Sequence, residues 1–199
     1  MTLDRGAQTR ARILQAAVKC FTAQGYAAAS VDDICSKAGV SKGAFYHHFE
    51  SKQLLFLALL QDWLSGLDRA MAAARRPTIP ETLVEMTRML PMALGSARNQ
   101  LGMWLEFWLQ ASHDKAVWKA TVAPYRHYRD LFEQLIQEGM DEGTLKKVDA
   151  HATAQVILSM AVGLFLQSVL DPQGEDWKET ARASMEIVIL GLIKAGRKA

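Results

Sequence analysis

The amino-acid sequence predicts an all-α fold of about nine helices. Apolar residues recur at the three- and four-residue spacing of a helix along most of the 199 residues. No segment sustains the two-residue alternation of a strand, and neither Asn-Gly nor Asp-Gly, the common hairpin turns, occurs. Half of the residues are hydrophobic and only two are cysteine, which excludes a disordered chain and a disulfide scaffold.

The first two expected helices are closely spaced. One runs over residues 9–23 with a single apolar stripe, and Gly25 just beyond it is a residue type that commonly ends a helix. Ser30 begins the second, because its hydroxyl can accept a hydrogen bond from the N–H of Asp33 while the Asp33 carboxylate reaches back. Gly39 then ends this helix and opens a tight turn.

The third helix has two chemically different faces. Ser41 caps it, and Phe45 and Phe49, one turn apart, mark the side that packs on the core. The opposite side is therefore basic, aromatic and partly bare backbone. It consists of Lys42, Gly43, Tyr46 and His47.

Longer helices follow. Ser51 caps a fourth helix from 52 to about 74, and the Arg-Arg-Pro-Thr-Ile-Pro segment at 75–80 is the clearest break in the chain. Further helices are expected at 80–94 with a bend near Pro91, 97–112, 115–142 with a break or bend at Pro124, 149–170 and 175–194.

The second and third helices have the features of a helix-turn-helix. Both are short and capped, and a four-residue turn that contains Gly39 joins them. In such a motif the second helix enters the DNA major groove, where Lys42 can reach the O6 and N7 acceptors of guanine and Gly43 lets the backbone approach closely. The side chains placed to hold phosphates are Ser30, Tyr46, His47 and Lys52.

The charge distribution favours a nucleic-acid surface near the start of the chain. Residues 1–56 hold seven Lys and Arg against four Asp and Glu, whereas the other 143 residues hold 16 against 17. Similar caps also occur in αα-hairpins that bind no DNA, so the pattern alone leaves both interpretations open.

The same segment resembles the DNA-binding domain of the tetracycline-repressor (TetR) family. The resemblance covers residues 8–68 nearly without gaps, with the motif helices at about 31–50. It is carried by Arg12-Ile13-Leu14-Gln15-Ala16-Ala17, Gly25-Tyr26, Ser30-Val31-Asp32-Asp33-Ile34, Ala38-Gly39-Val40-Ser41-Lys42-Gly43-Ala44-Phe45-Tyr46-His47-His48-Phe49, Ser51-Lys52 and Leu54-Leu55.

The resemblance implies a homodimer that binds a palindromic double-stranded DNA operator through three N-terminal helices, with residues 80–199 as a helical ligand-binding and dimerisation domain. The positions that match DNA-contacting residues of the recognition helix are Lys42, Gly43, Ala44, Tyr46, His47 and His48. Those that match backbone-contacting positions are Ser30, Ser41 and Lys52. Ala44 departs from members with a polar residue there, which implies that part of the operator is read through DNA shape.

The last two helices are apolar on more than one side. Such a helix must bury both sides, one in its own subunit and the other against a partner's matching pair, and this predicts a four-helix dimer seam. A bundle closed within one subunit is the alternative. The stripes are Val156, Met160, Gly163, Leu164 and Gln167 in one helix and Ala181, Met185, Val188, Ile189 and Leu192 in the other.

Large side chains gather in the middle of the C-terminal domain. Thioether and aromatic surfaces suit a pocket for a small lipophilic effector, although ordinary core packing explains many of them. If Glu106 faces inward, it would favour a lipophilic cation; otherwise it lies on an exposed face. The candidate pocket residues are Met89, Met103, Trp104, Glu106, Phe107, Trp108, Tyr125, Tyr128 and Phe165.

Several classes of function lack their sequence signals. We expect no metal site and no cofactor, because no close spacing of ligands is present beyond the diverging His47-His48 pair. We also expect no enzyme, because no phosphate-binding glycine loop or nucleophile elbow occurs. The charged N-terminus predicts a cytoplasmic protein, and the polar residues within Ala150–Leu170 favour a buried helix over a membrane span.

Two functional hypotheses follow. The first is a transcriptional repressor that a small lipophilic effector releases from its operator, with a coupling free energy of typically 1–3 kcal/mol. The second is an architectural or division-linked DNA-binding protein of the same fold, which has no effector and uses its C-terminal body for protein contacts.

Overall fold

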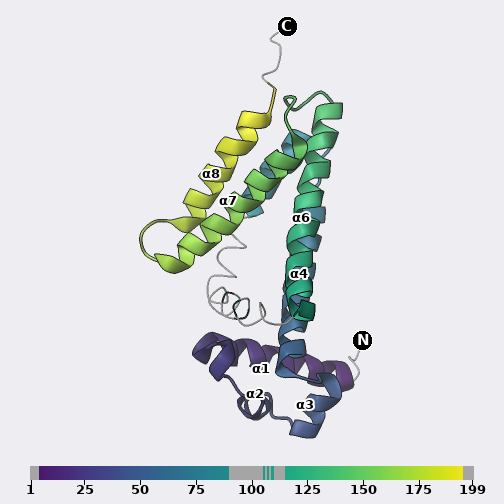
Figure 1. Ribbon diagram of the computed structural model, residues 1–199, viewed down its shortest axis with the longest axis vertical. Helices are drawn as coiled ribbons and strands as arrows, with labels where there is room; N and C mark the ends of the chain where they lie inside the picture. The colour runs from purple at the N-terminus through teal and green to yellow at the C-terminus, as the bar shows by residue number, and fades with distance from the viewer. Residues whose placement is uncertain (1–4, 90–104, 106, 108, 110–114, 195–199) are drawn as a thin grey trace. The chain divides into compact units, whose positions relative to one another are not determined.

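The computed structural model describes residues 5–89, 105, 107, 109 and 115–194 (Figure 1). Residues 79–89 are helical, as are residues 105, 107 and 109. Within these described residues the only extended pairing is one isolated bridge, Leu145 to Ile193, so the predicted all-α fold is confirmed. The named helices are α1 (Arg5–Ala28), α2 (Val31–Ala38), α3 (Lys42–His48), α4 (Lys52–Ala73), α6 (Lys115–Asp141), α7 (Ala150–Leu170) and α8 (Trp177–Leu192).

The chain forms two compact units. The first comprises residues 1–67 and 99–120, and the second residues 68–98 and 121–199. This division differs from the expected domains, 8–68 and 80–199, because Phe107 and its described neighbours belong to the first unit.

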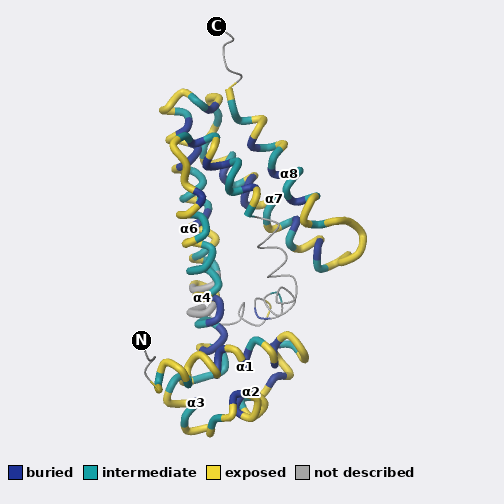
Figure 2. Tube along the Cα trace, turned by 180° about the vertical axis from the view of Figure 1, so that it is seen from behind, coloured by how far each residue is buried: buried dark blue, intermediate teal, exposed yellow. Residues whose placement is uncertain are grey.

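The core of the first unit joins one face of each of its helices. Ile13 and Phe21 of α1 are buried against Ile34 of α2, Phe45 of α3 and Leu55 of α4. These buried positions, dark blue in Figure 2, follow the apolar stripes of the sequence. α1 begins earlier than expected. Gly25 has non-helical backbone angles, a φ of 84° and a ψ of 165°, so the first helical segment ends there, as expected, and a second short segment continues α1 to Ala28.

Phe107, one of the candidate pocket residues, is part of this core. Its ring stacks on Phe56, with centroids 4.0 Å apart, and meets the ring of Tyr26 edge-on at 5.2 Å. Only 1% of Phe107 is exposed. Its apolar ring is thus buried between two aromatic neighbours of the first unit.

The core of the second unit is closed by a corner between α6 and α7. Gly139 permits this corner, because a Cβ there would lie 2.5 Å from Leu145 Cδ1 and 2.9 Å from Ile79 Cγ2. Leu145 also forms the bridge to Ile193, which ties the end of α8 to the corner. The buried residues are Ile79, Leu83, Leu135, Ile136, Leu145, Ile157, Met185 and Ile189.

Helix α6 continues through Pro124, so of the expected break or bend at this residue the break is wrong. Proline removes one backbone hydrogen bond, and the packing of the following turns offsets this loss. The buried Tyr128 donates a hydrogen bond from its hydroxyl to Asp68 Oδ1 at 2.8 Å, and Arg75 pairs with Glu138 at 2.9 Å. Both contacts hold the end of α4 and its following turn against α6.

Helices α7 and α8 lie side by side and keep part of their apolar surface exposed (Figure 1). By length and composition alone α7 could cross a bilayer, a test that core helices of soluble proteins also pass. Leu164 and Ala181 pack together between the two helices. The exposed apolar side chains on them are Val156, Val162, Leu166, Leu170, Ile187 and Leu190.

Candidate nucleic-acid interface

Reciprocal hydrogen bonds start α2. The Ser30 hydroxyl accepts from the N–H of Asp33 at 3.1 Å, and the N–H of Ser30 donates to Asp33 Oδ2 at 2.9 Å. The expected capping box is therefore present. The hydroxyl and the N–H of Ser30 both donate to Asp33 Oδ2, which favours the ionised carboxylate and lowers the pKa of Asp33.

Contacts from Arg12 of α1 fix the turn between α2 and α3. Gly39 takes the left-handed conformation, with a φ of 62°, in which the chain leaves α2. The guanidinium of Arg12 donates to the carbonyl of Ala38 at 2.7 and 3.1 Å and to that of Gly39 at 2.7 Å. A planar cation thus satisfies two carbonyls at the end of α2 and sets the angle at which α3 departs.

Helix α3 packs by its phenylalanines, as the sequence predicts. The Ser41 hydroxyl caps the helix by accepting from the N–H of Ala44 at 3.1 Å. Phe45 is fully buried and Phe49 is 5% exposed, with the guanidinium of Arg10 5.2 Å from the Phe49 ring centroid. Both phenylalanines belong to the core of the first unit, so this inner face anchors α3 there.

The opposite face of α3 is open to solvent. Lys42, Gly43, Tyr46 and His47 are exposed, while Ala44 and His48 are half-buried at its edge. Tyr46 keeps 52% of its surface accessible, a large value for an aromatic residue. The structure thus brings together the residues that the sequence assigns to DNA reading, on one face of one short helix.

An ion pair on this face has no counterpart in the sequence-based interpretation. Lys42 Nζ lies 2.8 Å from Asp32 Oδ1, and both side chains are more than 60% exposed. The hydrogen bond to Asp32 and its negative charge raise the pKa of Lys42. The only signal in the sequence is an acidic residue in the first turn of α2, which also suits the helix dipole.

Lys52, which the sequence predicts to hold a phosphate, contacts backbone carbonyls in this structure. Its ammonium donates to the carbonyls of Tyr26, Ala27 and Ala29 at 2.8, 3.2 and 2.9 Å, and it lies 4.6 Å from the Tyr26 ring centroid. Three acceptors match the three N–H donors of an ammonium. The contacts make Lys52 a clamp between α4 and the end of α1.

The candidate effector residues are dispersed. Burial and the hydrogen bond to Asp68 raise the pKa of Tyr128. Tyr125 of α6 accepts a hydrogen bond from the Gln155 side chain of α7. Met89 and Phe165 are half-buried. Outside the described residues lie Met103, Trp104, Glu106 and Trp108.

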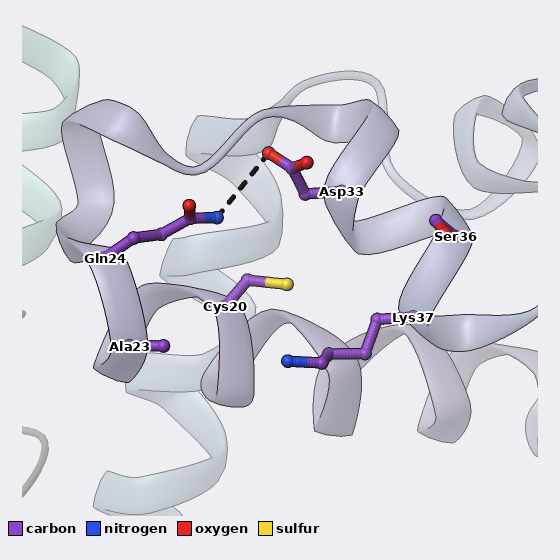
Figure 3. Close-up of a pocket in the computed structure, with 6 residues that line it drawn as sticks. All are labelled: Cys20, Ala23, Gln24, Asp33, Ser36 and Lys37. Carbon is purple, nitrogen blue, oxygen red and sulfur yellow. Dashed lines mark hydrogen bonds between the residues drawn. The ribbon is translucent and has the colours of Figure 1, made fainter.

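A hollow of about 360 Å³ lies between α1 and α2 (Figure 3). The Cys20 sulfur points toward it, beside Gln24, Asp33 and Lys37. Burial raises the pKa of this thiol and of Cys35, which opposes formation of a reactive thiolate. In the part of the chain that the structure describes, no group of three or more His, Cys, Asp or Glu is placed to hold a metal ion.

Two family matches cover most of the chain. Residues 13–59 match "Bacterial regulatory proteins, tetR family", and residues 80–193 match "BetI-type transcriptional repressor, C-terminal". Among curated relatives, the regulator UidR of Escherichia coli K12 is 25% identical over 84% of this chain and 83% of its own length. The regulator BetI 2 of Chromohalobacter salexigens is 27% identical over 85% and 82%.

Solved structures share the whole fold. A TetR transcription regulator from Haloarcula marismortui has a TM-score of 0.84 at 21% identity, covering 94% of this chain and 98% of its own. A transcriptional regulator from Saccharomonospora viridis, solved in complex with choline, has a TM-score of 0.79 at 22% identity with the same coverage. Together with the exposed helix-turn-helix and the two family matches, these likenesses place the chain in the TetR family of DNA-binding transcriptional regulators.

Proposed function

We propose that this protein is a cytoplasmic, homodimeric repressor that leaves a palindromic operator when a small lipophilic effector binds its C-terminal unit. The observation that carries the proposal is the solvent-facing side of α3, held on a capped and buried frame, in a chain whose remainder matches the BetI-type repressors. Regulation rather than catalysis is part of this proposal.

DNA reading is assigned to the exposed face of α3. The Lys42 ammonium would contact guanine O6 and N7, and Gly43 would allow the backbone close to the bases. Tyr46 and His47 lie one turn further along and would hold phosphates. Ala44 offers a methyl group only, which supports a contribution from DNA shape.

Dimerisation is assigned to α7 and α8. Leu170 and Ile187 are 74% and 73% exposed, values that favour burial against a second copy. Two half-sites of a palindrome lie roughly 34–36 Å apart, so one α3 cannot occupy both. Pairing of α7 and α8 with their copies would supply the second reading head.

An effector is supported by fold neighbours that were solved with ligands. The Saccharomonospora viridis regulator holds choline, and the regulator FadR of Bacillus subtilis, at 18% identity and a TM-score of 0.75, holds stearoyl-CoA. Tyr125, Phe165 and Met89 are the described candidates for contacts to such a molecule, and Glu106 is proposed to select a lipophilic cation.

The test combines mass, DNA selection and ligand binding. Light scattering should give twice the chain mass, and selection from a random duplex pool should return an inverted repeat. A thermal-shift screen with matched cationic, neutral and anionic lipophilic compounds, repeated with Glu106→Gln, should find a stabiliser that also weakens operator binding. Ligand at 100 times its Kd should add about 2.7 kcal/mol to the free energy of unfolding.

The outcomes separate the parts of the proposal. A monomer, or no selected repeat, would overturn the operator-binding dimer. Stabilisation by cations that Glu106→Gln leaves intact would remove Glu106 from the site. If no compound in the panel stabilises the protein, the effector-free architectural role is favoured.

A further inference from the structure

The ion pair between α2 and α3 cancels charge where the reading helix would meet DNA. Lys42 is the first residue of α3 and the only Lys or Arg in that helix, and Asp32 lies in the first turn of α2. Their side chains are 62% and 64% exposed, so the pair faces solvent rather than the core. At this point the surface therefore presents an ion pair in place of an unpaired cation.

The two neighbouring aspartates of α2 have different partners. Asp33 is engaged by Ser30, whose N–H and hydroxyl both donate to its Oδ2, at 2.9 and 2.6 Å. Asp32 takes no part in the capping box and reaches across the turn to Lys42. Asp33 already provides the acidic residue that the start of α2 needs for its capping box. The contact of Asp32 with Lys42 therefore calls for another explanation, which we seek in the exposed surface that the two side chains form.

We propose that Asp32 is a specificity-determining residue for the DNA binding described above, and that it acts through Lys42. It cancels the attraction of Lys42 for phosphates of any sequence. It also holds one N–H of the ammonium, so that the other two point to the base edge and bind where guanine presents O6 and N7. The inference rests on the proposed function and names a residue that opposes binding to wrong sequences.

The expected size of the effect follows from counterion release. Each phosphate that a protein neutralises contributes about 0.9 to the slope of log affinity against log salt, which at 0.15 M corresponds to roughly a fivefold gain in affinity. Asp32→Asn frees one cation in each subunit. Affinity for random DNA should therefore rise about fivefold per subunit, while operator affinity, in which Lys42 already has guanine acceptors, changes less.

The experiment measures discrimination directly. The operator is first selected from a random duplex pool with the wild-type protein. Fluorescence anisotropy then gives affinities for operator and random duplexes over 0.05–0.3 M salt, concentrations chosen at about the range in which such slopes are measured. The variants are Asp32→Asn, Asp32→Glu, and Asp32→Asn combined with Lys42→Met, next to Lys42→Met alone.

Asp62→Asn is the matched control. Asp62 is an exposed aspartate of α4, so its substitution changes the net charge by the same amount and leaves the pair intact. Circular dichroism and thermal unfolding establish that each variant is folded. Asp32→Glu keeps the charge and should retain wild-type discrimination.

The expected result is a steeper salt slope on random DNA and an operator-to-random ratio lower by about fivefold per subunit for Asp32→Asn alone. An unchanged ratio, an equal effect of Asp62→Asn, or the same effect of Asp32→Asn in the Lys42→Met background would overturn the inference. If the wild-type protein selects no sequence, the proposed function fails with it, and that result is seen before any variant is measured.

Discussion

Removing the Lys52 ammonium is expected to loosen the end of α1 rather than to remove a phosphate contact. Lys52→Met keeps the aliphatic stem and deletes the three N–H donors that bind the carbonyls of Tyr26, Ala27 and Ala29. These carbonyls lie just before α2, where the chain leaves the kink at Gly25. Without the ammonium they must find water, and the segment that positions α2 loses its tether to α4.

The magnitude follows from the nature of these hydrogen bonds. A hydrogen bond to a charged group contributes about 1.5–3 kcal/mol. The three carbonyls here share one half-buried cation, and hydration of these carbonyls in the variant offsets part of the lost free energy. We expect Lys52→Met to lower the free energy of local opening at the end of α1 by about 2 kcal/mol. At about 1.4 kcal/mol per factor of ten, this is roughly a 30-fold increase in the open population.

Hydrogen exchange detects such local opening, because amides exchange from the open state. Protection of residues 21–35 should fall in Lys52→Met by about the factor given above and stay unchanged in Lys19→Met, which removes an exposed lysine of α1. The opposite pattern, wild-type exchange with the salt slope of DNA binding lowered by about one unit per subunit, would show that Lys52 binds a phosphate and refute the reasoning.

Three further substitutions test other contacts. In Arg12→Lys the ammonium lacks the planar donor fork that holds the two carbonyls, so operator affinity should fall at least tenfold while the oligomeric mass stays the same. Unchanged affinity would contradict the role of this residue in orienting α3. Gly139→Ala should lower the free energy of unfolding by about 1–3 kcal/mol through overpacking, measured by urea titration, whereas Gly191→Ala, with open space at its Cβ, should not; equal effects would disprove the close approach. Phe107→Ala should cost the first unit about 3–5 kcal/mol, seen as lost exchange protection there; a change in effector affinity with stability intact would return Phe107 to the pocket.

The features that sequence predicts well are the ones set within a few residues. The capping box at Ser30, the cap at Ser41 and the left-handed Gly39 each depend on backbone groups at most five residues away. The two faces of α3 follow from the same local logic, because Phe45 and Phe49 lie one turn apart and determine which side is buried. The boundaries of α2, the start of α3 and the reading face therefore follow from local sequence alone.

Contacts between distant residues were beyond the same reasoning. Phe107 joins a core whose other members lie at least 47 residues earlier in the chain, and nothing in its own helical spacing distinguishes that core from an effector pocket. In the sequence Lys52 is indistinguishable from a solvated lysine at the start of a helix, and only the fold places the end of α1 beside it. Pro124 shows the converse, because a local rule against proline gave way to packing further along α6.

The pair of Asp32 and Lys42 shows where these two kinds of information meet. Each residue by itself satisfies a local preference, an acid at the start of α2 and a cation toward DNA on α3, and the sequence gives no reason to connect them. The tight turn at Gly39, which Arg12 fixes from α1, brings the first turns of both helices close enough for a contact of 2.8 Å. A substitution at Arg12 should therefore weaken the ion pair as well as the orientation of α3, and the salt slope of Arg12→Lys on random DNA should become steeper, as it should for Asp32→Asn. Since Arg12→Lys conserves the net charge, the steeper slope that we expect does not arise from added charge, and we attribute it to the release of Lys42.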